Sequence, residues 1–159
     1  MHARQICPGI KIVATVHWER RLFDSLIPLP DGTSYNAYLV QGSKGTALVD
    51  SADPALHDEL MEQLQDVDQI DYIVSQHSEQ DHSGCIPQLL ERYPNAKLVC
   101  SKKAEELLTT HLQVPTARLK GVEDGESISL GNKTLQFVYT PWVHWPETMC
   151  TYVPEEIGR

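Results

Sequence analysis

Potential metal ligands are concentrated in one short stretch of the chain, HSEQDH at positions 77–82. Its ligand-type side chains are His77, Glu79, Asp81 and His82. Residues spaced by two in a tight turn can point the same way, so we expect the first three to converge, with His82 offset. Imidazole and carboxylate together suit divalent and trivalent first-row metals. The alternative interpretation is a solvated acidic loop in which Asp81 or Ser83 caps the following helix.

A second segment could contribute one more ligand. In PWVHWP, at positions 141–146, His144 lies between Trp142 and Trp145. A histidine flanked by tryptophans is more often a packed core residue than a ligand. Beside a metal cluster, however, aromatic rings would exclude water and orient the imidazole. We therefore expect His144 to join the metal site.

The elements around HSEQDH place it at the end of a strand. Two short apolar runs, Thr46–Asp50 and Asp71–Gln76, are typical of strands buried on both faces, and the cluster follows the second run directly. Open α/β sheets bind ligands just beyond the carboxyl ends of their strands. The sequence thus predicts that the ligands gather at one edge of a sheet.

The remaining elements complete a mixed sheet with helices on its outer face, in a single domain. Further strands are expected at Lys11–His17, Ser34–Gln41, Lys97–Cys100, Ser127–Leu130, Lys133–Thr140 and Met149–Val153, with a loop at 27–34. Helices are expected from Asp53-Pro54, around Gly84–Arg92, and after Ser101 as a cap, the last with His111 on its inner face.

Composition excludes several classes of function. With 13 Lys and Arg against 22 Asp and Glu, the net charge of −9 disfavours nucleic acids and anionic membranes. No run is long and apolar enough to span a membrane, and no secretory signal is apparent, so we expect a cytoplasmic protein. The four cysteines (Cys7, Cys85, Cys100 and Cys150) form no CxxC pair and are expected to be thiols without a metal or a disulfide.

Four motifs together resemble one known family. HSEQDHSG, at 77–84, is similar to the H-x-H-x-D-H motif of the metallo-β-lactamase superfamily, with Glu79 in place of the second histidine. Together with GTSYNAYL (32–39), ALVDSADP (47–54) and HWPETM (144–149), it resembles the flavodiiron proteins. The resemblance implies a metallo-β-lactamase-like αββα sandwich, of which this chain supplies the first half. It also implies a non-haem diiron centre that reduces O₂ to water or NO to N₂O with electrons from FMN.

The same resemblance assigns the ligands. His77, Glu79 and His144 would bind one iron and Asp81 the other, while His82 matches a position that is not always a direct ligand. Asp50 resembles a superfamily aspartate that supports the metal loop. A bridging aspartate and a later histidine of the family lie in parts of the domain that this chain does not contain, as does the flavodoxin-like FMN domain. We therefore expect the 159-residue chain to bind no FMN and to be inactive by itself.

The resemblance further implies a rubredoxin-like or flavin electron donor and a homodimer or tetramer. Two alternatives stay open. One is a hydrolase of the same superfamily, in which a metal-bound hydroxide attacks an ester or thioester, although Glu79 and HWPETM argue against it. The other is a non-catalytic, truncated remnant that acts only in binding or assembly.

Overall fold

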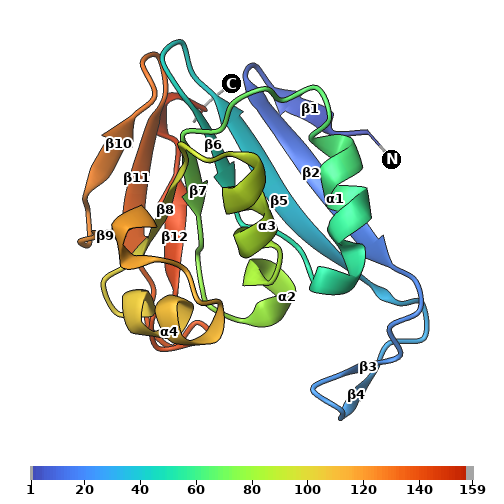
Figure 1. Ribbon diagram of the computed structural model, residues 1–159. Helices are drawn as coiled ribbons and strands as arrows, with labels where there is room; N and C mark the ends of the chain where they lie inside the picture. The colour runs from blue at the N-terminus through green and yellow to red at the C-terminus, as the bar shows by residue number, and fades with distance from the viewer. Residues whose placement is uncertain (1, 157–159) are drawn as a thin grey trace.

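The computed structural model describes residues 2–156 as three layers, with helices on one face of a large sheet and a smaller sheet on its other face (Figure 1). The large sheet has the order β1-β2-β5-β6-β7-β8-β9 and is antiparallel up to β6 and parallel from β6 to β9. Its strands are β1 (Arg4–Cys7), β2 (Ile10–His17), β5 (Thr33–Gln41), β6 (Thr46–Val49), β7 (Tyr72–Val74), β8 (Lys97–Ser101) and β9 (Leu119–Val122).

Helices and the second sheet cover the two faces of this large sheet. The helices are α1 (His57–Gln63), which follows a 3₁₀ turn at Pro54–Leu56, α2 (Gln80–Ser83), α3 (Ile86–Arg92) and α4 (Ala104–His111). The second sheet contains β10 (Ser127–Ser129), β11 (Thr134–Tyr139) and β12 (Met149–Tyr152), in that order. None of the helices within residues 2–156 has the length and hydrophobicity that crossing a bilayer requires.

Side chains of the central strands alternate between two hydrophobic cores. In β6, Leu48 packs in the cluster on the helix side, whereas Val49 packs in the cluster between the two sheets. The same division separates Ile73 from Val74 in β7, because successive strand residues point to opposite faces. These strands are buried on both faces, which explains their continuous apolar sequence and fixes the strand ends that carry the polar cluster.

The structure confirms the mixed α/β sheet with helices on an outer face and most of the expected elements. Two edge strands, β1 and β9, were not expected from the sequence. The stretch at 27–34, expected to be a loop, contains β4 (Ile27–Pro28), which pairs with β3 (Leu22–Phe23) in a two-residue ladder. A pairing this short leaves no periodic pattern in the sequence.

Two expectations around α4 were wrong. Ser101 does not cap the helix: it is the last residue of β8, it is buried, and its Oγ donates a hydrogen bond to the carbonyl oxygen of Glu147 at 2.7 Å. His111 is exposed and is not packed in the core. The helix is only two turns long, with Ala104 and Leu108 buried, and His111 is its last residue and lines an open cavity.

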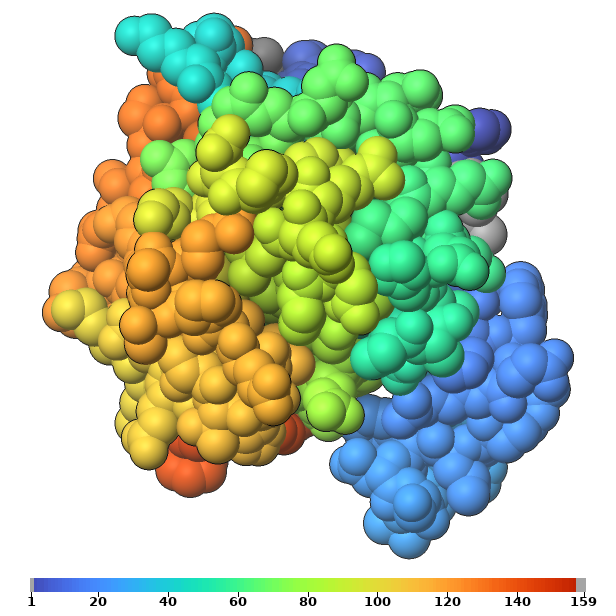
Figure 2. Space-filling model, in the orientation of Figure 1, coloured from blue at the N-terminus to red at the C-terminus, as the bar shows by residue number. Residues whose placement is uncertain are grey.

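The β3–β4 hairpin projects from the body of the molecule as an arm (Figures 1 and 2). Near its base, Arg20 forms an ion pair with Asp53 at 2.9 Å. Trp18 is 63% exposed and Leu26 is 79% exposed, so the arm presents large apolar side chains to solvent.

Candidate metal centre

The carboxyl ends of the parallel strands meet where the polar cluster begins. The backbone N–H of Asp50, just after β6, donates to the carbonyl of Val74 in β7 at 2.7 Å, and Ser75 N–H donates to Val99 O in β8 at 2.9 Å. The chain then forms a short loop, residues 75–79, and continues into α2. The end of β7 and the first residues of α2 therefore hold the HSEQDH stretch at one edge of the sheet.

The first group of potential ligands combines this loop with the segment after β11. One ligand atom from each of His77, Glu79 and His144 lies within 4.8 Å of the others. Glu79 Oε2 is 2.9 Å from His144 Nε2 and 3.4 Å from His77 Nε2. The carboxylate thus lies between two imidazoles that come from distant parts of the chain.

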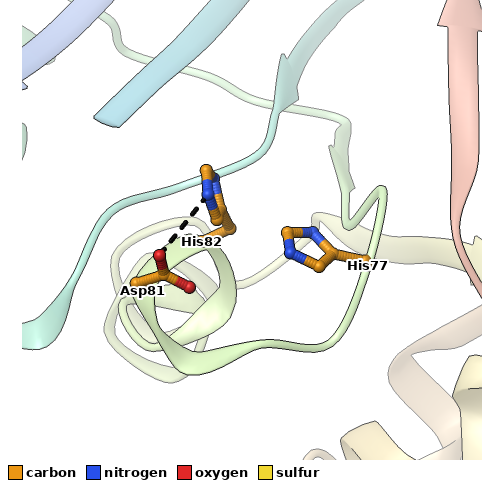
Figure 3. Close-up of side chains that lie close together, drawn as sticks. All are labelled: His77, Asp81 and His82. Carbon is orange, nitrogen blue, oxygen red and sulfur yellow. Dashed lines mark ion pairs between the residues drawn. The ribbon is translucent and has the colours of Figure 1, made fainter. Parts of the chain in front are cut away.

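The second group shares His77 with the first. His77, Asp81 and His82 again have ligand atoms within 4.8 Å of one another. Figure 3 shows His77 on the loop and the other two side chains on α2, with an ion pair of 3.6 Å between His82 Nε2 and Asp81 Oδ2. The two groups lie side by side because they have one imidazole in common.

The donor atoms in the second group fit a metal ion. Asp81 Oδ1 and His82 Nδ1 are both buried and have no hydrogen-bond partner within residues 2–156. Buried polar atoms are normally paired, so two unpartnered ones on residues whose ligand atoms lie within 4.8 Å of one another are compatible with metal binding. The mixed nitrogen and oxygen set suits first-row transition metals.

Asp50 holds the start of the loop that carries His77 and Glu79. Its Oδ1 accepts a hydrogen bond from Gln76 N–H at 2.9 Å and its Oδ2 accepts one from Gln76 Nε2 at 3.3 Å. Gln76 Oε1 in turn accepts the N–H of Thr151 in β12 at 2.6 Å. Burial raises the pKa of Asp50 to about 6, although the hydrogen bonds from Gln76 act in the opposite direction.

The two tryptophans around His144 do not act alike. Trp145 lies with its ring edge-on to His77 and to His144, at centroid distances of 6.3 Å in both cases. Trp142, by contrast, is 73% exposed, so the expectation that it shields the site was wrong. The side chain of His144 is 60% exposed as a result. Within the described residues, this side of the site is open.

Other residues at the site carried no recognisable signal in the sequence. Tyr35 is buried with its ring edge-on to His82 at 5.7 Å, and burial raises the pKa of its hydroxyl. A cavity of about 370 Å³ reaches the acidic ligands, and it is lined by Arg20, Asp53, Glu79, Gln80, Asp81, His111 and Trp145. Arg20 and His111 come from sequence segments far from HSEQDH, and only the fold brings them to this cavity.

Comparisons with known proteins identify the family. A family model described as "ODP family beta lactamase" matches residues 33–157. The nitric oxide reductase of Moorella thermoacetica is 39% identical over 95% of this chain and 39% of its own length. Among solved structures, the rubredoxin oxygen:oxidoreductase of Desulfovibrio gigas has a TM-score of 0.90 at 34% identity, over 98% of this chain and 39% of its own. The flavodiiron protein of Giardia intestinalis has a TM-score of 0.89 at 29% identity, over 98% of this chain and 38% of its own.

The chain belongs to the flavodiiron protein family. The same matches confirm the metallo-β-lactamase-like fold class inferred from the H-x-E-x-D-H motif. The chain spans less than two-fifths of the length of the curated relatives it matches. Three points stay predictions for this flavodiiron chain. They are the domain boundaries, the compartment and the assignment of metal ligands to His77, Glu79, Asp81, His82 and His144.

Proposed function

We propose that this chain provides iron ligands for a flavodiiron oxidoreductase that reduces O₂ to water or NO to N₂O with electrons from FMN. The observation that carries the proposal is the pair of adjacent ligand groups that share His77, with Glu79 at the position where hydrolases of the superfamily have a histidine. A carboxylate makes the site harder and more anionic than a third imidazole would, which favours iron over zinc.

His77, Glu79 and His144 would hold one iron, and Asp81, with His82, would hold the other. When bound, the irons supply electrons to the diatomic substrate, which needs one electron per NO or four per O₂. The negative charge of Glu79, between the imidazoles of His77 and His144, stabilises the more oxidised state of the site. Asp50 and Gln76 fix the loop, and the cavity beside Arg20 and His111 gives small molecules access to Glu79 and Asp81.

The second ligand group is the weaker one. Asp81 and His82 are its members besides the shared His77, which is fewer protein ligands than a tight site needs. We therefore propose that the chain forms part of a larger iron-binding domain, and that FMN, a rubredoxin-like or flavin donor and a homodimeric or tetrameric assembly belong to the complete protein. The names of two relatives, nitric oxide reductase and rubredoxin oxygen:oxidoreductase, support NO and O₂ as substrates.

A chimera tests this function. The corresponding segment of the Desulfovibrio gigas rubredoxin oxygen:oxidoreductase, 34% identical, would be replaced by this chain, and O₂ and NO consumption would be measured with reduced rubredoxin as the donor. We expect the chimera to consume at least one of the two gases. Glu79→Ala should abolish this activity, whereas Glu91→Gln, on the exposed side of α3, should leave it unchanged.

The proposal fails if the chimera folds and binds FMN but consumes neither gas. Ester hydrolysis by the zinc-loaded chimera, without consumption of either gas, would instead support the hydrolase alternative. Flavin absorbance of the folded chimera provides the control for folding in both cases.

A further inference from the structure

Glu147 is a buried carboxylate that none of the assignments above uses. It lies three residues after His144 and is only 3% exposed. Its Oε1 accepts a hydrogen bond from the backbone N–H of Ser78 at 3.0 Å. Ser78 lies between His77 and Glu79 in the sequence, so this bond joins the segment that carries His144 to the loop that carries the other two ligands of the first group.

Two further contacts fix the same segment. The carbonyl oxygen of Glu147 accepts the hydroxyl of Ser101, at the end of β8, at 2.7 Å. The N–H of Met149 donates to the carbonyl of Gln76, immediately before His77, at 2.8 Å. The backbone from the carbonyl of Glu147 to Met149 is therefore held against the ends of β7 and β8, while the Glu147 side chain contacts the loop at Ser78.

The stability of the fold does not explain why the carboxylate of Glu147 is buried. Glu147 Oε2 is buried and has no hydrogen-bond partner in the described part of the chain, and the same is true of Ser78 Oγ. Burial of a carboxylate with a single hydrogen bond is unfavourable compared with an apolar side chain of similar size. Within residues 2–156, Glu147 also belongs to neither of the groups that could hold a metal.

We propose that Glu147 is a positioning residue for the iron site: its carboxylate sets the distance of His144 from His77 and Glu79 through the N–H of Ser78. This inference rests on the proposed function, because it requires His77, Glu79 and His144 to bind a metal. The acceptor oxygen, at the length of a glutamate side chain, is the feature that matters for this role. The negative charge is not required.

Two substitutions separate these features. Glu147→Gln keeps the length and the acceptor oxygen but removes the charge, whereas Glu147→Met keeps the length and removes the acceptor. The metal-free 159-residue chain and both variants would be titrated with Co²⁺ alone, whose visible absorption reports the geometry of its ligands. Protection of the Ser78 amide against hydrogen exchange would be measured by NMR in the metal-free proteins, and Glu91→Gln, at an exposed position, is the matched control.

We expect Glu147→Met to bind Co²⁺ roughly 10- to 100-fold more weakly than the unmodified chain, with a changed absorption spectrum and loss of protection at Ser78. Glu147→Gln and Glu91→Gln should bind Co²⁺ as the unmodified chain does, with the same spectrum. If the Met variant does not fold, Glu147→Asp tests the same role, because it keeps a carboxylate but shortens the side chain and so withdraws the acceptor from the Ser78 N–H. It should also weaken Co²⁺ binding and change the spectrum.

Equal affinity and equal spectra for the unmodified chain and Glu147→Met, or for the unmodified chain and Glu147→Asp where the Met variant does not fold, would overturn the inference and leave the proposed function intact. Weak binding by both Glu147→Gln and Glu147→Met would also overturn it, because the charge would then be the required feature. Failure of the unmodified chain to bind Co²⁺ at all would overturn this inference, whereas the proposed function is decided separately by gas consumption of the chimera.

Discussion

Asp50 is the residue whose ionisation opposes folding most clearly. Burial raises its pKa to about 6, above its usual value of 3.8, so the folded chain binds a proton that the unfolded chain releases. The stabilising effect of the neutral form is complete well below pH 3.8 and is lost as the pH rises through 6. Its size, about 3 kcal/mol, follows from 1.36 kcal/mol per pKa unit.

The prediction for Asp50→Asn concerns the pH dependence. Asparagine tolerates the positive φ of 62° at this position and keeps the acceptor for Gln76 N–H. The free energy of unfolding of the metal-free chain, relative to that of the variant, should fall by about 2.4 kcal/mol between pH 4 and pH 7, because part of the full effect is already lost at pH 4. Denaturant titrations at several pH values measure this difference, and a constant difference would show that Asp50 has an ordinary pKa.

Two cysteines should be unreactive in the folded protein. Burial raises the pKa of Cys85 to about 11 and that of Cys100 to about 12, so neither thiol ionises near neutral pH. Cys150 is exposed. With a disulfide reagent at pH 8, Cys150 should react at once, whereas Cys85 and Cys100 should react after denaturant is added. Equal rates for all four cysteines of the native chain would contradict this placement.

At the residue scale, the sequence predicted which ligand types converge but not which residues position them. Local spacing predicted that His77, Glu79 and Asp81 converge and that His82 is offset, and this detail was wrong. Asp81 instead lies with His77 and His82, and Glu79 lies with His77 and His144, because Asp81 and His82 are on α2 whereas Glu79 precedes it. Glu147 and Arg20 reach the site through contacts between distant segments, Glu147 to Ser78 and Arg20 to Asp53. A single sequence contains no signal for such contacts, because their geometry depends on the packing of whole elements.

At the element scale, the site depends on how closely α2 packs against the turn before α1. A Cβ atom added to Gly84 would lie 2.5 Å from the carbonyl oxygen of Gln80 and from Cγ of Pro54. Gly84→Ala should therefore push α2, which carries Asp81 and His82, away from Pro54. We expect a loss of roughly 1–3 kcal/mol in the free energy of unfolding, together with weaker metal binding.

The matched control for Gly84→Ala is Gly125→Asn. Gly125 has a φ of +78° and no atom within 4 Å of an added Cβ, and asparagine tolerates this backbone conformation. This change should alter the stability by no more than about 0.5 kcal/mol. Thermal unfolding of both variants measures the contrast, and equal effects would mean that α2 has room to accept a side chain at Gly84.

The sequence predicted the central strands well and the edges of the sheets poorly. β6, β7 and β8 are buried on both faces, and such strands have continuous apolar runs. β1 and β9 lie at the edges of the large sheet, where charged residues interrupt the apolar pattern: Arg4 is exposed and Lys120 is partly exposed. The helix cap expected at Ser101 was wrong for another reason: its hydroxyl donates to the carbonyl oxygen of Glu147, a contact between distant segments, and not to the following helix.

At the scale of the whole molecule, exposed apolar residues and net charge have opposite effects on association. The arm presents Trp18 and Leu26 to solvent, and Trp142 and Val143, which follow β11, are at least 70% exposed. Exposed apolar patches promote association. The net charge of −9 opposes it by mutual repulsion, and salt screens this repulsion.

We therefore expect the isolated chain to self-associate more strongly as the salt concentration rises. Light scattering after size exclusion, between low and physiological ionic strength, measures the change in mass. The double variant Leu26→Ser and Trp142→Ser should reduce it, since both side chains are among the most exposed apolar residues. A chain that stays monomeric at every salt concentration would show that these residues do not drive association.

The central claim is that the two ligand groups sharing His77 hold iron. Its most direct test is a crystal of the protein loaded anaerobically with Fe²⁺, with diffraction recorded on both sides of the iron absorption edge. We predict an anomalous peak for an iron bound by His77, Glu79 and His144, and a weaker second peak for an iron bound by Asp81. Iron-loaded crystals in which these side chains show no anomalous peak between them would contradict the account.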